Sequence, residues 1–289
     1  MNRRYSKRFE PWFWLLPFVV LSMLFCFIPL AKTFFSSFFI VNNMGELLEF
    51  VGLENFLLLM KDEIFLKSIL NTLKFTAITV PIVLFLGFWI SLFSIKVKRL
   101  SFLHEFVLSI PCAISLPVAA MIFQTLLMPR VGFISKLLGV DFDWLYNPDY
   151  SIFALAIIQI WSSTAFAYVF YRNSFLKINS ELIESAEMDG ASFFQLVHFV
   201  YFPQSLKTTF YLVFANLSTS MLMMSLSNVL TNGGPQYSTI TVAQYIYSEF
   251  INSGNMTVAN AATIFYLIVF SPLIISFVVL LRKWRTESL

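Results

Sequence analysis

Neutral polar side chains recur at helical spacing in one strongly apolar part of the sequence. On a continuous helix, Asn216, Ser220 and Ser227 would fall within about 40° of one another, with Met223 in the same stripe. Trp161 lies in an earlier apolar run. Amide and hydroxyl groups beside aromatic rings suit an uncharged polyhydroxyl solute, which needs hydrogen bonds rather than a countercharge. The alternative is that these small polar residues join membrane helices by close packing and shared hydrogen bonds.

A second chemically distinctive stretch, residues 178–203, gathers acidic side chains in a chain with only 12% charged residues. Glu184 and Glu187 fall in a predicted short helix over 181–188. We expect Ser180 to cap this helix, because a serine hydroxyl can accept from the first free backbone N–H groups and negative charge is favoured near a helix start.

The same stretch predicts a turn and a second helix. Asp189 and Gly190 form a turn pair, since glycine adopts the left-handed conformation that ends a helix. The second helix should begin near Ser192 and stop where Pro203 breaks it. Its apolar face comprises Phe193, Leu196, Val197 and Val200. The segment could lie on the bilayer, but its acids have the wrong sign for anionic headgroups, so docking to a protein fits better.

The chemistry that the sequence lacks also limits the function. No carboxylate or histidine lies in the middle of an apolar run, and Lys74 and Glu105 fall near run ends, which weighs against an ion-coupled carrier. No G-x-x-x-x-G-K-[ST] phosphate loop is present, so any ATP-driven step requires another polypeptide. His104 and His198 are expected to be interfacial or packing residues. We predict no catalytic residue, no metal site and no bound cofactor.

The elements that must position these residues are membrane helices. The chain is 58% hydrophobic, has 35 Phe and a mean hydropathy of +0.77, far from soluble composition. Its charges divide it at the interval of about 20 residues that crosses a bilayer. We therefore predict an all-α polytopic protein with six transmembrane helices, near 11–31, 70–95, 104–127, 151–171, 205–229 and 258–281. Prolines at 17, 81, 111 and 117 suggest kinks within these helices rather than ends.

Orientation follows from the basic residues, most of which flank one set of helix ends, at 3–8, 96–99, 172–207 and 282–285. Lys and Arg are retained on the cytoplasmic side, which places both termini and the 178–203 stretch in the cytoplasm. The first run is too long for a cleaved signal peptide and is expected to be an uncleaved anchor. The net charge of +3 is what such flanks produce and does not indicate nucleic-acid binding.

Three short motifs in the acidic stretch keep a recognisable spacing of glycine and proline. They are Glu184-Ser185-Ala186, Asp189-Gly190-Ala191 and Val200-Tyr201-Phe202-Pro203. This pattern resembles the cytoplasmic loop of ABC importer permeases, specifically binding-protein-dependent sugar permeases, with E-A-A, then three residues, G, and later I-x-L-P. Further segments are similar to the first permease of maltose-type and multiple-sugar importers: Phe50 to Phe56, Asn71 to Leu73, Leu230 to Pro235, and Ser238-Thr239.

The resemblance implies a single permease domain over 1–289, with the type I ABC importer fold, in the cell membrane. The loop at 178–203 would be the coupling helix that sits in a cleft of the ATPase, which assigns coupling to Glu184, Ser185, Ala186, Asp189, Gly190, Ala191, Phe193 and Pro203. The expected partners are a second homologous permease, two cytoplasmic ATPase subunits that use ATP and Mg, and an extracytoplasmic solute-binding protein.

The solute implied by the resemblance is a sugar, expected to be a disaccharide or oligosaccharide. The family places a sugar site on the later helices, where Trp161, Asn216, Ser220, Met223 and Ser227 are the candidates. Three alternatives stay open: another solute such as glycerol phosphate, a self-contained secondary carrier, and a membrane scaffold or receptor that signals through the loop.

Overall fold

The computed structural model describes residues 14–96, 101–139 and 142–287. The basic flank at 3–8 and the residues Lys98 and Arg99 lie outside this range, so the cytoplasmic location of the termini stays a prediction. The chain divides into two compact units, residues 1–63 with 245–272 and residues 64–244 with 273–289.

The first unit combines apolar helices with a short hairpin. Its first helix covers Trp14–Ser36 and includes a π-helical turn, η1 (Met23–Phe27), that leads into α2 (Ile28–Ser36). The other elements are β1 (Phe39–Val41), β2 (Leu47–Phe50), α3 (Glu54–Leu59), η3 (Ser248–Asn252) and the first part of α14 (Met256–Glu287).

The hairpin is an addition to the predicted all-α architecture. Strands β1 and β2 pair antiparallel, with Phe39 opposite Phe50 and their ring centroids 5.1 Å apart. The Asn55 side chain donates to the carbonyls of Ser37 and Phe39, both at 3.0 Å. Such short strands leave little hydropathy signal, and aromatic cross-strand packing stabilises them.

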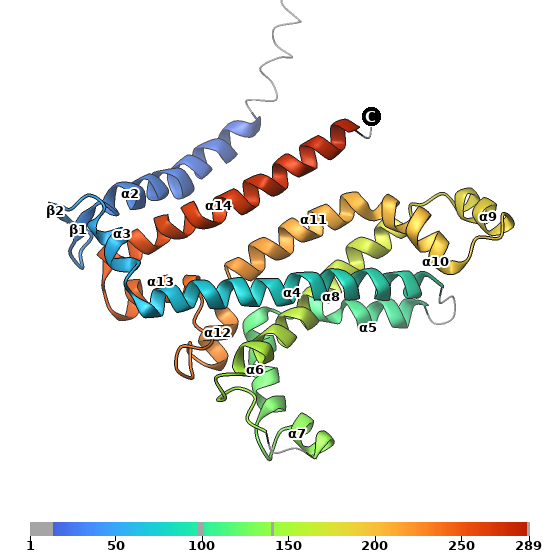
Figure 1. The fold of residues 1–289 in the computed structure, drawn as a ribbon, viewed down its shortest axis with the longest axis horizontal. Helices are drawn as coiled ribbons and strands as arrows, with labels where there is room; N and C mark the ends of the chain where they lie inside the picture. Colours follow the sequence, from blue (N-terminus) through green and yellow to red (C-terminus); the bar gives the residue numbers. More distant parts are fainter. Residues whose placement is uncertain (1–13, 97–100, 140–141, 288–289) are drawn as a thin grey trace, which may run out of the picture. The chain divides into compact units, whose positions relative to one another are not determined.

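The second unit holds most of the helices. They are α4 (Glu63–Lys96), α5 (Ser101–Ala113), α6 (Leu116–Leu127), α7 (Phe133–Leu138), α8 (Ser151–Phe175), α9 (Ser180–Met188), α10 (Phe193–Leu196), the π-turn η2 (Val197–Tyr201), α11 (Phe202–Met221), α12 (Ser225–Leu230) and α13 (Val242–Tyr247). Helices α5 and α11 both pack against α8, and α9 and α10 lie beyond the end of α8 (Figure 1).

Small residues allow α4 and α8 to approach closely. A Cβ atom on Gly87 would lie 2.6 Å from the Cβ of Ala167, so no larger residue fits there. Beside this contact the Ser91 hydroxyl donates to the carbonyl of Tyr168 at 2.9 Å. Close packing and a shared hydrogen bond therefore hold these two helices together.

The described residues contain three helices long and apolar enough to cross a membrane, Trp14–Ser36, Glu63–Lys96 and Ser151–Phe175. A fourth span arises if α5 and α6 count as one bent helix, and Met256–Pro272 is a shorter apolar helix. The multi-pass character predicted from hydropathy is confirmed. The full number of six crossings stays a prediction.

The predicted helix at 104–127 is broken rather than kinked. Helices α5 and α6 meet at a bend of 102°, and Figure 1 shows α6 turning away from α5. Ser115 is extended at the break, and Pro117 occupies the opening turn of α6. Proline is tolerated there because its missing N–H needs no helical partner, so Pro117 marks a start, contrary to the prediction.

The predicted helix at 205–229 is also interrupted. Helix α11 ends at Met221 and α12 begins at Ser225. The Thr241 hydroxyl donates to the carbonyl of Met223 at 2.5 Å, which satisfies a backbone group left without a helical partner. Ser227 therefore does not share a continuous helix with Asn216, and the predicted stripe is wrong beyond the break.

Candidate solute pocket and coupling segment

A neutral polar pocket of about 340 Å³ opens beside the break between α5 and α6. We call it the solute pocket. It is lined by Cys112 and Leu116 at the break, by Gln159, Ser162, Ser163 and Phe166 of α8, and by Ala215, Asn216 and Thr219 of α11. No charged residue is among these lining residues, so the pocket offers hydrogen bonds and apolar surface only.

Helical periodicity explains why α8 and α11 present these side chains together. On α8, the spacing from Gln159 to Ser163 and on to Phe166 follows one face. On α11, Asn216 and Thr219 are three residues apart and also share a face. Because α8 and α11 pack against each other, the two polar faces line one pocket.

The polar groups of the pocket are partly satisfied by their own helices. The Gln159 amide donates to the Ser163 hydroxyl at 2.8 Å, and the Asn216 amide donates to the Leu212 carbonyl at 2.8 Å. The Thr219 hydroxyl donates to the Ala215 carbonyl at 3.1 Å. Each of the two amide bonds uses one N–H and leaves the second N–H and the side-chain carbonyl oxygen available, which suits a solute that presents hydroxyl groups.

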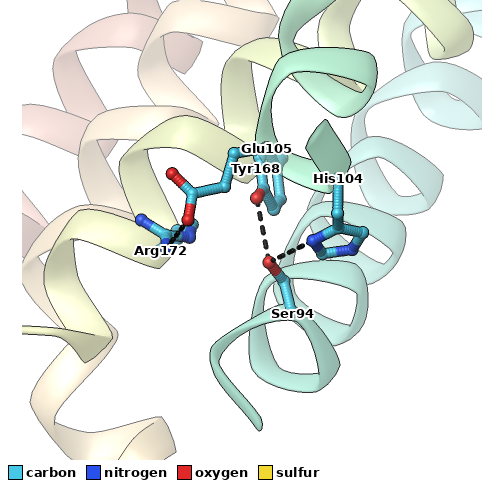
Figure 2. A network of polar contacts seen from close by, with 5 residues as sticks. All are labelled: Ser94, His104, Glu105, Tyr168 and Arg172. Atoms are coloured by element: carbon cyan, nitrogen blue, oxygen red, sulfur yellow. Dashed lines mark hydrogen bonds and ion pairs between the residues drawn. The ribbon is translucent and has the colours of Figure 1, made fainter. Parts of the chain in front are cut away.

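A polar network joins α4, α5 and α8 further along α8 (Figure 2). The Ser94 hydroxyl lies 2.9 Å from the Tyr168 hydroxyl and 3.3 Å from Nδ1 of His104. Arg172 forms an ion pair with Glu105. His104 is therefore a hydrogen-bonded packing residue, as expected, and Glu105 is paired inside the protein in addition to lying near a helix end.

The acidic stretch forms the helix–turn–helix that the sequence predicts, with one change at its start. Helix α9 is capped by Asn179, whose side-chain oxygen accepts from the backbone N–H of Glu181 at 3.1 Å. Ser180, the predicted cap, is instead the first helical residue. Either type of side chain can cap a helix, and backbone geometry selects Asn179 because its conformation is extended.

The turn and the second helix follow. Gly190 has φ +80°, a left-handed conformation that residues with a side chain rarely adopt. Ser192 and Gln195 form a capping box at the start of α10. The helix then continues through η2 into α11, and Pro203 lies in the opening turn of α11. Contrary to prediction, Pro203 does not break the helix, since a proline fits that position.

We define the coupling segment as residues 180–203, and its apolar side chains divide into two sets. The first set packs inward on a cluster that includes Leu92 and Phe175: Ile183, Ala186, Phe193, Leu196, Val197 and Val200. Phe193 stacks on Phe93, and the Lys96 ammonium lies 4.0 Å from the centroid of the Phe193 ring. Phe193 thus holds the segment against α4, a role that the sequence alone does not indicate.

The second set, which we call the outward set, is largely exposed, although Phe194 also lines an apolar pocket with Phe85 and Trp89 of α4. Met188 is 89% exposed, Phe194 73% and Phe199 71%. The carboxylate residues Glu184, Glu187 and Asp189 of the same segment are exposed as well. At the inner side, burial raises the pKa of the Tyr201 hydroxyl above its usual value, and the nearby Glu187 carboxylate adds to the rise. The outward apolar set was missed by helical periodicity, which gives a helix two faces without saying which one the rest of the chain covers.

Comparison with known families decides what kind of protein this is. Residues 64–285 match the sequence signature of a family described as "Binding-protein-dependent transport system inner membrane component". The chain belongs to this family of ABC importer permeases. The resemblance stated from the coupling-segment motifs is thereby confirmed.

Relatives that match over more than 90% of their length are also named as transport permeases. This permease is 28% identical over 292 residues to the sn-glycerol-3-phosphate transport system permease protein UgpA of Yersinia pestis, with 98% of each chain covered. It is 26% identical to the probable ABC transporter permease protein YurN of Bacillus subtilis, covering 91% of this chain and 93% of the relative.

Solved structures show the same fold. A permease chain of a bacterial ABC transporter involved in the import of the acidic polysaccharide alginate superimposes with a TM-score of 0.79 at 20% identity, covering 97% of this chain and 99% of that one. A chain of the MetNI methionine ABC transporter gives a TM-score of 0.56 at 16% identity, covering 75% and 94%. The permease fold is therefore that of ABC importers, as predicted.

The five predicted solute residues of this permease have different surroundings. Only Asn216 lines the solute pocket. The Trp161 ring contacts Phe123 at 5.3 Å between centroids, and Met223 is buried in the core. The Ser220 hydroxyl pairs with the Thr79 hydroxyl at 3.0 Å, and the Ser227 hydroxyl donates to the Thr239 carbonyl at 2.7 Å. The Ser220 contact joins α11 to α4 and fits the helix-joining alternative, whereas the Ser227 contact joins α12 to the loop that follows it. A solute role for these four residues stays a prediction.

Proposed function

We propose that this ABC importer permease conducts an uncharged, hydroxyl-rich solute, a disaccharide or oligosaccharide, through a path that includes the solute pocket. The observation that supports this proposal is the neutral lining of that pocket, with the carbonyl oxygens of Gln159 and Asn216 available as acceptors. An anionic solute would require a nearby cation, because burying an unpaired charge is costly. Phe166 adds a flat apolar surface of the kind that sugar rings contact.

Glycerol phosphate is the second candidate, because the name of the Yersinia pestis relative specifies sn-glycerol-3-phosphate. Its phosphate dianion would be served best by Lys or Arg. Such residues are not among those lining the solute pocket. We therefore rank a neutral sugar first.

The coupling segment is proposed to dock on a separate cytoplasmic ATPase through Met188, Phe194, Phe199 and the neighbouring carboxylates. Exposed apolar residues rimmed by polar ones mark protein interfaces. Because the inward set packs on α4 and α8, a push on the segment would be transmitted to α8, which lines the solute pocket. ATP and Mg would be used by two ATPase subunits, and this chain would bind no cofactor.

Two further partners complete the proposed importer. A second homologous permease would supply the other half of the path, and an extracytoplasmic binding protein would deliver the solute. One of the similar solved structures is titled as an alginate ABC transporter in complex with alginate pentasaccharide-bound periplasmic protein, which supports such a partner here.

The test is to purify this chain with its partner subunits in lipid and measure ATP hydrolysis as binding protein loaded with different solutes is added. We expect stimulation by at least one neutral disaccharide or oligosaccharide and none by glycerol phosphate. In the stimulating case, Gln159→Leu with Asn216→Leu should reduce the response while assembly is kept. Stimulation by glycerol phosphate alone would overturn the neutral-solute proposal and leave the permease family intact.

A further inference from the structure

A second polar pocket, of about 480 Å³, lies where α8 ends and α11 begins. Its polar lining consists of Lys177 and Lys207, the amides of Asn173 and Gln204, and the hydroxyl groups of Ser174 and Thr208. We call it the dilysine pocket. No carboxylate is among its lining residues, in contrast with the exposed acids of the neighbouring helix α9.

The two lysines of the dilysine pocket are exposed at its surface and are not neutralised by an ion pair within the described part of the chain. Neither Lys177 nor Lys207 forms an ion pair with a residue that the structure describes. Two like charges that share one pocket repel each other, and an anion placed between them removes the repulsion. The amide and hydroxyl groups around them add donors of the kind that hold phosphate oxygens.

The dilysine pocket is separate from the solute pocket, although both occupy the α8–α11 face. Phe166 lines the solute pocket and Phe170 lines the dilysine pocket. The centroids of these two rings are 4.6 Å apart, and the Phe170 ring stacks on that of Tyr211 at 5.0 Å. The aromatic rings thus form the partition between a neutral pocket and a cationic one.

We propose that the dilysine pocket is a binding site for a phosphate ester anion, held by Lys177 and Lys207. The group would come either from the headgroup of an anionic phospholipid or from a soluble phosphate ester. An anion bound there bridges the end of α8 to the start of α11, the two helices between which the coupling segment is inserted. A bound anion therefore stabilises the packing of these two helix ends, because a ligand that binds only the folded arrangement favours that arrangement.

The experiment uses the full chain assembled with its partner subunits in phosphatidylcholine nanodiscs. Thermal unfolding is followed while inorganic phosphate is added, with chloride at equal ionic strength as reference. We expect phosphate to raise the unfolding midpoint of the wild type, and the apparent affinity to fall by about tenfold in Lys177→Gln/Lys207→Gln because two charge-assisted contacts are removed. Lys61→Gln/Lys136→Gln removes the same charge from exposed positions outside the pocket and should respond as the wild type does.

A second arm separates the two sources of phosphate. Nanodiscs that contain phosphatidylglycerol should raise the midpoint of the wild type, but not that of the Lys177/Lys207 variant, if a lipid headgroup fills the pocket. A response only to soluble phosphate identifies a soluble ester. If the double variant does not assemble, Lys177→Arg/Lys207→Arg should retain the response and each single Gln variant should weaken it. Equal responses in wild type and Gln variants, or no response to either probe, would overturn the site, and neither outcome depends on which solute is transported.

Discussion

The solute pocket and the coupling segment each contain side chains whose polarity differs from that of the surrounding residues, but in opposite directions. In an apolar membrane region, the solute pocket gathers amides and hydroxyl groups. In the acidic cytoplasmic stretch predicted from the sequence, the coupling segment exposes Met188, Phe194 and Phe199. Each departure costs free energy that binding would offset, so we expect the first region to bind a polar solute and the second to bind a protein.

The two regions also differ in how they limit the free-energy cost of these buried polar and exposed apolar groups. In the solute pocket, Asn216 and Thr219 donate to carbonyls one turn earlier, which satisfies one amide N–H and one hydroxyl before a solute arrives. In the coupling segment, the three side chains of the outward set stay at least 71% exposed. Burial of such a side chain on a partner contributes roughly 1.5–3 kcal/mol.

The largest effect is expected from a charge placed on the outward set of the coupling segment. Met188→Asp should abolish co-purification with the ATPase, because docking would bury an unpaired carboxylate. The control is Met44→Asp in the hairpin turn, since Met44 is 87% exposed, almost as much as Met188. Retained assembly in the Met188 variant would show that the outward set does not face the ATPase.

The next effect tests the other side of the comparison, the solute pocket. Gln159→Leu/Asn216→Leu should weaken solute-stimulated ATP hydrolysis by roughly 10- to 100-fold, because two hydrogen-bonding groups are lost to a site that depends on them. Ser220→Ala is the matched control, because Ser220 contacts Thr79 rather than the pocket. It should lower the unfolding midpoint slightly and leave solute dependence unchanged. If Ser220→Ala alters solute dependence as strongly as the pocket variant does, Ser220 is part of the solute path and not only a packing contact.

The turn of the coupling segment should give an intermediate effect. Gly190→Val places a β-branched residue at φ +80°, a strain of about 1–2 kcal/mol, although a Cβ there meets no atom within 4 Å. We expect ATP hydrolysis to continue while uptake falls, measured in the same proteoliposomes. Gly190→Asn should be nearly normal, because asparagine tolerates this conformation better. Normal uptake by the valine variant would argue against a coupling role for the turn.

The smallest effect concerns the cap of α9. Asn179→Ala should destabilise the start of the helix by about 1 kcal/mol, whereas Ser180→Ala should change little. Hydrogen exchange of the α9 amides, measured by mass spectrometry, distinguishes the two positions. The reverse ranking would restore Ser180 as the cap.

Features that depend on local chemistry could be predicted from the sequence. Apolar run length located the long helices α4 and α8, because crossing hydrocarbon requires a continuous stretch of apolar residues. The pair Asp189 and Gly190 located the turn, since few residues other than glycine adopt a left-handed conformation readily. Family motifs in the same segment identified the permease.

Features that depend on contacts between residues distant in sequence could not be predicted in this way. The break after Met221 is stabilised by Thr241, whose hydroxyl donates a hydrogen bond to the Met223 carbonyl. The solute pocket exists because α8 packs on α11, and each helix contributes only part of its polar lining. In the coupling segment, Phe93 and Lys96 of α4 engage Phe193, whereas the next residue, Phe194, stays 73% exposed. A helix's own periodicity specifies two faces, and only its neighbours determine which face remains for a partner.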